Sequence, residues 1–385
     1  MLVLTARALY TPLEKIDRPL VVVEDGVVVT VDSRSHGEIP AAAKRLDFDD
    51  GILTPGLVDI HIHGAAGYDV MQADAEGRSR IEKFLAHRGV TSYFPTTVTA
   101  PIDTIRRALE QLADGIEGAT KHSDRAQPLG IHLEGPFLSH ARRGVHPPEN
   151  LLEPTLANFD RFWQAARGHI RVMTIAPELD GAAEVIAEAT KRGVSISIGH
   201  SDADLKAARA GVAAGARHAT HTFNAMRPLD HRDPGILGEV LSNPALTADI
   251  IADGIHVHPE VVRLFLQAKG PERAVLITDA TAAAGMPDGK YWLGSLEVDV
   301  KDGKCLHDGK LAGSVLTLDR ALRNAMEFSS WDLRQALRAA TLNPAMVVNA
   351  ARKGRIEPGA DADLLVLSSD GQVRATITKG ALASS

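Results

Sequence analysis

The sequence predicts an α/β protein, with a (β/α)8 TIM-like barrel and a small β-sandwich domain formed from both chain termini. Between residues 51 and 351, short apolar runs alternate with stretches of helical period, a pattern typical of a parallel sheet covered by helices. Histidines and carboxylates stand where several runs end, and barrel enzymes build their active sites at those strand ends. A doubly wound open sheet is the structural alternative, although no GxGxxG or GxxxxGK[ST] motif supports it.

The composition is that of a globular protein with two or three domains. The chain has 385 residues, of which 44% are hydrophobic and 24% charged, enough to bury a sizeable core. Its net charge of −7 argues against nucleic acid as a partner, while a few basic side chains can still bind a small phosphate. The single cysteine, Cys305, excludes an intramolecular disulfide and an all-thiolate metal site. With no leader pattern and no long apolar stretch, we expect a cytoplasmic protein without a membrane span.

The two chain ends have the character of β hairpins. An Asp-Gly turn at 25–26 separates two apolar runs near the start, and a second at 370–371 does the same near the end. This dipeptide favours hairpin turns. Since both ends share the pattern and the middle does not, we expect one small β domain built from both. The expected limits are 1–51 and 358–385 for the β domain and 52–357 for the barrel.

Within the barrel, apolar runs and helical stretches follow one another in order. Apolar residues recur at helical spacing from 102 to 112, directly after Pro101, which predicts a helix there. Asp202 is expected to cap a further helix over 205–214. The expected strands end near His63, Glu134, Ala176, His200, His221, Ala252 and Asp279.

The first of these strand ends carries two histidines. In the run LVDIHIHG at 57–64, strand alternation sends Asp59, His61 and His63 to one face. Inward positions of one strand lie about 7 Å apart, a gap that two imidazoles can close onto one cation. A lone histidine is more often structural, but an HxH pair before glycine favours a metal site.

Four later strand ends each add a carboxylate or an imidazole. Glu134 ends an apolar run before Gly-Pro, and His200 and His221 end two short runs. Each of these alone has a structural interpretation as a salt-bridged, capping or packing residue. Asp279 shares a face with apolar residues of its run, where an ionised carboxylate needs a metal or a hydrogen-bond donor. Together these residues predict one metal-dependent active site.

The donor set indicates the class of metal and of reaction. Imidazole and carboxylate ligands without thiolate suit Zn(II), and also Fe(II), Mn(II) or Co(II). A cation with an open position lowers the pKa of a bound water toward ~7 and polarises a carbonyl oxygen, while a nearby aspartate can move the proton. We therefore expect hydrolysis of an amide or a related C–N bond.

Seven short segments mark the strand ends and loops of the expected barrel: PGLVDIHIHG at 55–64, HLEGPF at 132–137, GHS at 199–201, FNAM at 223–226, ADGIH at 252–256, TDAT at 278–281 and LAGS at 311–314. Together they resemble the motifs of the N-acetylglucosamine-6-phosphate deacetylase family within the amidohydrolase superfamily. The HxH pair with a later Asp marks the superfamily, and the other motifs together mark the deacetylases. The resemblance implies the same barrel and terminal β domain. It also implies deacetylation of N-acetyl-D-glucosamine 6-phosphate, in amino-sugar catabolism and cell-wall recycling.

The resemblance further implies roles for residues of the site. Asp279 would be the catalytic acid and base, since it takes a proton and returns it to the departing amine, and His146 would donate a hydrogen bond to the substrate. Five residues would bind one or two divalent ions per subunit, with zinc the first expectation: Glu134, His200 and His221 at the main site, and His61 and His63 at a second.

Substrate contacts follow from the same resemblance. Arg232 would bind the phosphate as a bidentate fork and would come from the neighbouring subunit of a homodimer. His132 and His218 are expected to be packing residues rather than ligands. The other implied substrate contacts are Val145, His146, Asn224, Ala225, Asp253, Gly254, Ile255, His256, Ala312, Gly313 and Ser314.

Two alternative functions differ in what they require of the sequence. Another amidohydrolase, acting on a different amide or cyclic C–N substrate, is expected to carry a Lys in place of Glu134 and no basic phosphate contacts. A non-enzymatic scaffold with the same barrel would be expected to have lost metal ligands, and this chain keeps them. The loop at 142–144 is the candidate for a lid over the site.

Overall fold

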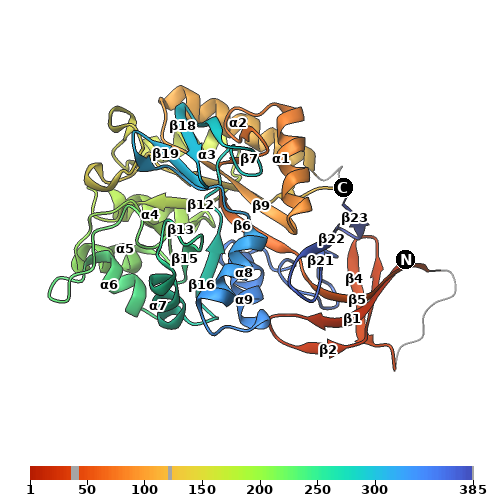
Figure 1. Ribbon diagram of the computed structural model, residues 1–385. Coiled ribbons are helices and arrows are strands. Elements are labelled where there is room, and N and C mark those ends of the chain that lie inside the picture. Colours follow the sequence, from red (N-terminus) through yellow and green to blue (C-terminus); the bar gives the residue numbers. More distant parts are fainter. Residues whose placement is uncertain (36–42, 120–123, 384–385) are drawn as a thin grey trace.

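The structure is a computed structural model that describes residues 1–35, 43–119 and 124–383. It has two parts, a body of parallel strands surrounded by helices and a separate sheet made by the two chain ends (Figure 1). Across the described ranges, every helix is too short or too polar to cross a lipid bilayer.

Short parallel strands form the centre of the body. Hydrogen bonds pair β6 with β9 and continue in order through β11, β12 and β13 to β14, and β15 pairs with β16. The strands are β6 (Leu57–Ile62), β9 (Val90–Thr97), β11 (Ile131–Glu134), β12 (Ile170–Ile175), β13 (Ser195–Ile198), β14 (His218–Ala219), β15 (Ala248–Ile251) and β16 (Ala274–Ile277).

The first and last of these strands are joined. A parallel bridge links Ile62 to Ala280, and the backbone N–H of Thr222 donates to Asp249 O (2.9 Å), which connects the end of β14 to β15. The first and last strands of an open sheet would lie at opposite edges. The arrangement is therefore that of a TIM-like barrel, with the carboxyl ends of its strands on one side.

A helix follows each of these strands along the chain, as the alternating pattern predicted. In α2, apolar residues at helical spacing, Ile105, Leu109 and Leu112, are buried, which gives the helix one face against the strands. The helices are α1 (Ala75–His87), α2 (Ile102–Gly118), α3 (Leu156–Ala165), α4 (Ala182–Lys191), α5 (Leu205–Ala214), α6 (Gly235–Ser242), α7 (Pro259–Lys269) and α8 (Leu318–Phe328), with α9 (Leu333–Ala340) and α10 (Leu342–Val347) after them.

The cap of α5 differs from the prediction. The helix spans the expected residues, but its N-cap is Asp204, whose side chain accepts from the Ala207 N–H. Asp202 instead accepts a hydrogen bond from Arg142 Nε (2.7 Å). Asp202 and Asp204, both in the segment SDAD, are alternative caps. Arg142, on another loop, engages Asp202 and leaves Asp204 to cap the helix.

The chain ends build one sheet together. Strand β5 pairs in parallel with β1 and antiparallel with β21, so segments from the two termini lie side by side. Hydrogen bonds link all eight strands into one network because β5 joins both halves. The ends of this network meet again where the Val28 N–H donates to Ala360 O (2.9 Å), and both halves contribute side chains to one hydrophobic cluster. The strands are β1 (Leu2–Tyr10), β2 (Lys15–Asp17), β3 (Pro19–Glu24), β4 (Val27–Ser33), β5 (Lys44–Pro55), β21 (Leu364–Leu367), β22 (Val373–Thr378) and β23 (Ala381–Leu382).

Alternate residues of this sheet serve two different cores. Leu364 and Val366 pack into a hydrophobic cluster of the terminal sheet itself, whereas Leu365 and Leu367 pack into the large core of the body. Because side chains alternate along a strand, one strand stabilises both parts and fixes the sheet against the barrel.

A small antiparallel sheet stands between β16 and α8 in the chain. Hydrogen bonds order it β17-β18-β19-β20, and the sequence had not indicated it. Further short strands are β10 (Gln127–Pro128), β7 (Gly64–Ala65) and β8 (Tyr68–Asp69). The strands of the small sheet are β17 (Gly289–Leu293), β18 (Leu296–Lys301), β19 (Lys304–His307) and β20 (Lys310–Leu311).

Candidate active site

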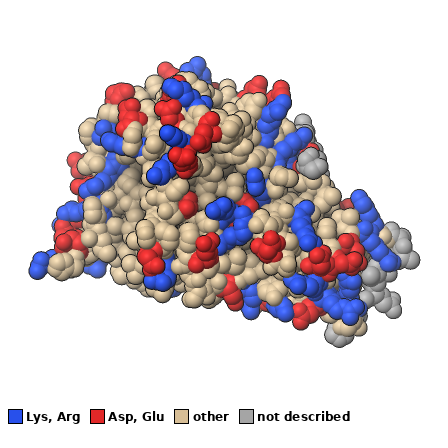
Figure 2. All heavy atoms as spheres, in the orientation of Figure 1, with Lys and Arg blue, Asp and Glu red and all other residues tan. Residues whose placement is uncertain are grey.

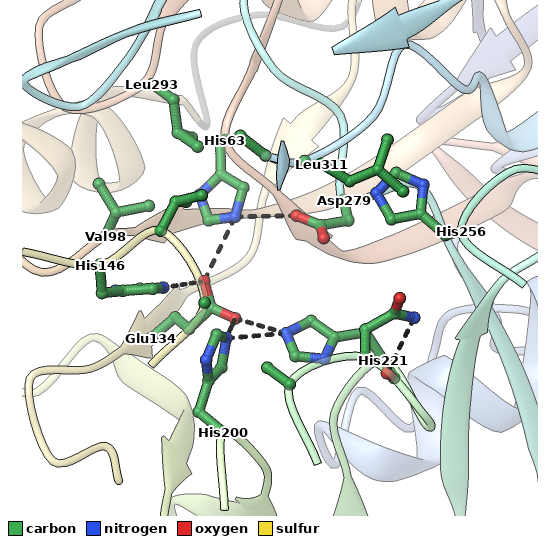
Figure 3. A pocket seen from close by; sticks show the side chains of 16 residues that line it. His63, Val98, Glu134, His146, His200, His221, His256, Asp279, Leu293 and Leu311 are labelled. Carbon is green, nitrogen blue, oxygen red and sulfur yellow. Dashed lines mark hydrogen bonds and ion pairs between the residues drawn. The ribbon is translucent and has the colours of Figure 1, made fainter. Parts of the chain in front are cut away.

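The predicted metal ligands and Asp279 meet at the carboxyl ends of the barrel strands. Five of the six line one cavity (Figure 3), and the sixth, His61, does not line it but has its Nε2 3.2 Å from that of His63. All six side chains are buried, so packing fixes their positions. His61 lies within β6 and His63 directly after it, Glu134 ends β11, His200 follows β13, His221 follows β14 and Asp279 follows β16.

Three of these residues turn the chain sharply out of its strand. His200, His221 and Asp279 have φ angles of 47°, 27° and 49°, in the left-handed region that residues with a Cβ rarely adopt. Such strain persists only where the surroundings hold it, and it is frequent at functional sites. Here the Asp279 N–H donates to His61 O and the Ser139 N–H to His200 O, both at 2.9 Å.

Glu134, His200 and His221 form one compact group. His221 Nε2 lies 3.0 Å from Glu134 Oε1 and 3.0 Å from His200 Nε2. His200 Nε2 lies 3.3 Å from the same carboxylate oxygen. One atom from each residue thus lies within 4.8 Å of the others, a spacing that a single divalent cation can bridge.

His61, His63 and Asp279 form a second group beside the first. The Nε2 atoms of His61 and His63 lie 3.2 Å apart, and His63 Nε2 lies 3.0 Å from Asp279 Oδ1. Glu134 stands between the groups, because its Oε1 is 3.4 Å from His61 Nε2 and its Oε2 is 3.4 Å from His63 Nε2. One carboxylate therefore faces both candidate metal positions.

Hydrogen bonds on the far sides of two rings show which nitrogens face the cavity as acceptors. His63 Nδ1 donates to Thr96 O and His200 Nδ1 to Arg142 O, both at 3.0 Å, because a carbonyl oxygen only accepts. A neutral ring that donates through Nδ1 has its lone pair on Nε2. Lone pairs so close to other ligand atoms need a proton or a cation between them. The residues present therefore fit a divalent metal.

The charges of the site favour a cation. Burial lowers the pKa of His63, but hydrogen bonds to Asp279 and Glu134 outweigh it and raise that pKa to about 10. Burial also lowers the pKa of His221, but the hydrogen bond and the charge of Glu134 outweigh burial and raise that pKa to about 9. Burial would raise the pKa of both carboxyl groups, yet the facing histidines, His61 first, hold each pKa well below its usual range. Both carboxylates are thus ionised.

His146 faces the same cavity as a neutral donor. The Thr99 N–H donates to His146 Nδ1 (3.2 Å), so the proton of the neutral ring is on Nε2, which lies 3.7 Å from Glu134 Oε2. Burial, with the neighbouring His200, lowers the pKa of His146 to about 3. At neutral pH this side chain can donate a hydrogen bond from Nε2 to a bound molecule.

A buried aspartate holds the turn that carries His221. One carboxylate oxygen of Asp249, on β15, accepts from His218 Nε2 (2.9 Å), and the other accepts from the His221 backbone N–H. His218 Nδ1 lies 2.7 Å from Thr247 Oγ1, so this histidine supports the site from behind. Sequence reasoning missed Asp249, whose signal is a single charge inside the apolar run ADII.

Two other polar residues brace the strands beneath the cavity. His132 has a packing role, with Nδ1 donating to Ile60 O (3.0 Å) and Nε2 lying 2.8 Å from Thr174 Oγ1. Asp59, on the predicted inward face of β6, accepts from Thr278 Oγ1 (2.6 Å). This bond ties β6 to the segment that carries Asp279.

Most of the expected substrate contacts line the cavity. His256 is oriented by Asp253, whose Oδ2 accepts from His256 Nδ1 (2.7 Å). Asn224 Nδ2 donates to His221 O (3.2 Å), which places this amide beside a candidate metal ligand. The expected contacts that line the cavity are Val145, His146, Asn224, Ala225, His256, Ala312 and Gly313.

The remaining expected contacts lie elsewhere in the described part of the chain. Ser314 is buried behind Asp279, and its hydroxyl donates to Thr278 O (2.6 Å). Arg232 is exposed on the loop before α6 and is not part of the cavity wall of its own chain. Asp253, Gly254 and Ile255 form the turn behind His256 and do not line the cavity either.

Apolar walls of the cavity escaped the sequence analysis. Val98 follows β9, while Leu293 and Leu311 come from β17 and β20. Leu311 opens the segment LAGS, but no motif marks Val98 or Leu293, because apolar side chains are common. The positions of Leu293 and Leu311 depend on the small antiparallel sheet. Gly144, in the loop expected to form a lid, also lines the cavity.

Comparison with known proteins agrees with this geometry. Residues 52–383 match the model of the amidohydrolase family. The N-acetylglucosamine-6-phosphate deacetylase of Bacillus subtilis is 36% identical over 378 residues, which cover 98% of this chain and 95% of the relative. An N-acetylgalactosamine-6-phosphate deacetylase of Escherichia coli O157:H7 is also 36% identical, over 99% of both chains.

Solved structures show the same likeness. A mutant N-acetyl-D-glucosamine-6-phosphate deacetylase from Mycobacterium smegmatis, in complex with N-acetyl-D-glucosamine-6-phosphate, has a TM-score of 0.92 and 35% identity over 100% of this chain and 99% of its own. The N-acetylglucosamine-6-phosphate deacetylase of Thermotoga maritima has a TM-score of 0.87 and 31% identity over 97% of each chain. This chain belongs to the amidohydrolase family, in the group of the N-acetylglucosamine-6-phosphate deacetylases.

Proposed function

We propose that the protein hydrolyses the acetamide of N-acetyl-D-glucosamine 6-phosphate to D-glucosamine 6-phosphate and acetate, in amino-sugar metabolism. The observation that carries this proposal is the convergence of two groups of possible metal ligands on either side of Glu134. Both groups are buried, and the chain that carries them matches curated deacetylases over nearly its full length.

The chain's donors suit a divalent metal, for which zinc is our first choice ahead of iron, manganese or cobalt. Glu134, His200 and His221 would hold it, with His61 and His63 holding a second ion where two are bound. When bound, such a cation polarises the substrate carbonyl and lowers the pKa of a water molecule.

Asp279 is the proposed proton carrier. Its carboxylate is ionised, and its Oδ1 is held 3.0 Å from His63 Nε2, so it can accept a proton from the attacking water. The same proton then goes to the amide nitrogen, because an unprotonated amine anion is a prohibitively poor leaving group. His146 donates from Nε2 to the carbonyl oxygen as negative charge develops there.

Substrate recognition divides between the two ends of the sugar. Asn224, Ala225 and His256 line the cavity and are proposed to meet the phosphate. Arg232, exposed and outside its own cavity wall, is proposed to complete the phosphate site of the neighbouring subunit in a homodimer. The cytoplasm remains our proposed location for this metabolism.

The test is acetate release by the metal-loaded protein. N-acetylglucosamine 6-phosphate, its unphosphorylated sugar and N-acetylgalactosamine 6-phosphate are compared, each with and without a chelator. Fast, chelator-sensitive release from the glucosamine phosphate is expected. Preference for the galactosamine phosphate would move the proposal to that substrate, and no release from any of the three, with metal bound, would overturn deacetylation.

A further inference from the structure

A second polar groove lies outside the catalytic cavity, between the end of α1 and the start of α8. It has a volume of about 370 Å³ and is lined by Arg88, Arg320 and Arg323, together with Thr317 and the turn at 253–255. Figure 2 shows Lys and Arg side chains, with Asp and Glu side chains beside them, near the centre of the visible face, over the region of α8 in Figure 1.

Two of the three arginines have no acidic partner among the residues that the structure describes. Arg88 Nε is buried without a hydrogen-bond partner, and the guanidinium lies 5.5 Å from the centroid of the Phe84 ring. Arg320 Nε donates to the neutral side chain of Asn324 (3.2 Å). Among the described residues, Arg323 is the one of these three arginines that forms an ion pair, with Asp319 at 3.0 Å.

The acidic residue that lines the groove, Asp253, has its carboxylate engaged within its own turn. Asp253 Oδ1 accepts from the backbone N–H groups of Ile255 and His256, both at 2.8 Å, and its Oδ2 accepts from His256 Nδ1. In addition, Thr317 makes no side-chain capping bond at the start of α8. The first N–H groups of a helix attract anions, so they add to the positive potential of the groove.

We propose that this groove binds a small phosphate-bearing anion at a site separate from the catalytic cavity. Guanidinium groups bind phosphoryl oxygens in bidentate geometry, and the two unpaired cations match the charge of a phosphate dianion. An anion here would lie against the turn at 253–255, which leads directly to His256 in the catalytic cavity. The proposal is independent of the deacetylase reaction.

The test is calorimetric titration of the full-length protein with inorganic phosphate. Wild type is compared with the double variant R88A/R320A and with Arg80→Ala, a matched control on α1 whose side chain is exposed and paired with Glu76. We expect the double variant to lose one binding event, with affinity reduced about tenfold or more, and the control to bind as wild type does.

Phosphate that binds in the catalytic cavity would remain in the double variant, which separates the two sites without any turnover. Equal phosphate affinity and stoichiometry in wild type and R88A/R320A would overturn the proposal. If the double variant does not fold, Arg320→Gln changes only an exposed side chain and serves instead. Its expected result is a weakening of several fold, and unchanged binding by this variant would also reject the groove as an anion site.

Discussion

At the scale of single residues, Asp279 is the group on which turnover should depend most. Asp279→Asn keeps the shape of the side chain but cannot take up and return a proton. We expect kcat to fall ~10²- to 10⁴-fold with KM little changed, because the substrate still binds. Steady-state acetate release, with the metal content of the same samples measured, checks this.

Asp299→Asn on β18 is the matched control, since it removes an equal charge from an exposed position. It is expected to react at the wild-type rate. Turnover of D279N within a few-fold of wild type would show that another group moves the proton.

The two raised histidine pKa values give a prediction about metal binding. Without metal, His63 and His221, with pKa values of about 10 and 9, hold protons at pH 7. Metal ligation requires neutral imidazole, so filling the site of His221 should release about one proton at pH 7, and filling the site of His63 as well should release about two. The number should fall as the pH rises through 9 and 10. Calorimetry in buffers of different ionisation enthalpy measures the number. Binding without proton release at pH 7 would contradict this assignment.

How far single residues can be predicted depends on whether their chemistry is visible in the sequence. Strand alternation suffices to bring His61 and His63 to one face, and a carboxylate at the end of an apolar run marks Asp279. Thr99 carries no such signal, although it fixes the tautomer of His146. Thr99 acts through a backbone N–H, which every residue except proline has, and through a hydroxyl whose Oγ1 lies 2.8 Å from His146 Nδ1.

At the scale of elements, the contact between β14 and β15 should set metal affinity. An amide at position 249 cannot accept both from His218 Nε2 and from the His221 N–H, so the strained turn at His221 loses support. We expect Asp249→Asn to weaken metal binding about 10- to 100-fold, with kcat near wild type at saturating metal. Competition with a chelator measures the affinity, and an unchanged value would leave Asp249 no positioning role.

The packing of α1 on β9 should give a pH-dependent stability. Burial, opposed by Arg125, raises the pKa of Glu82 from 4.5 to about 7, and Tyr93 OH donates to its carboxyl group (3.3 Å). The folded state thus binds this proton more tightly than the unfolded state. The stabilising contribution is complete below pH 4.5 and is lost as the pH rises through 7.

Glu82→Gln removes this dependence because the amide does not ionise. The unfolding temperature of E82Q minus that of wild type should therefore increase from pH 5 to pH 8, by the order of a few degrees. Thermal unfolding at both pH values, with equal metal loading, checks the difference. A constant difference would mean that Glu82 has an ordinary pKa in the folded protein.

Elements with strong periodicity could be predicted, and those defined by tertiary contacts could not. The apolar spacing of α2 identified that helix, but the α5 cap moved from Asp202 to Asp204 because Arg142 engages Asp202. The small antiparallel sheet from β17 to β20 is mostly exposed and polar, and its strands are short. It nevertheless supplies two apolar walls of the cavity, which explains why these walls were missed.

At the scale of the whole molecule, the joining of the two chain ends was predictable and the pairing of their strands was not. Matching Asp-Gly turns indicated one β domain from both termini. The pairing of β5 with both β1 and β21 makes that domain a single sheet, because one long strand, Lys44–Pro55, continues to the start of the barrel. Pairing partners far apart in sequence leave no trace in local patterns.

The proposed homodimer predicts complementation between two inactive variants. In a mixed dimer of D279N and R232A subunits, the site of the R232A subunit has its own Asp279 and would receive Arg232 from its partner. That site is complete, whereas the other lacks both groups. If each variant alone is inactive, equal mixing should restore about a quarter of wild-type activity, because half of the randomly formed dimers carry one intact site of two. If Arg232 acted on its own subunit, every site would lack one group, and mixed dimers verified by mass would remain inactive.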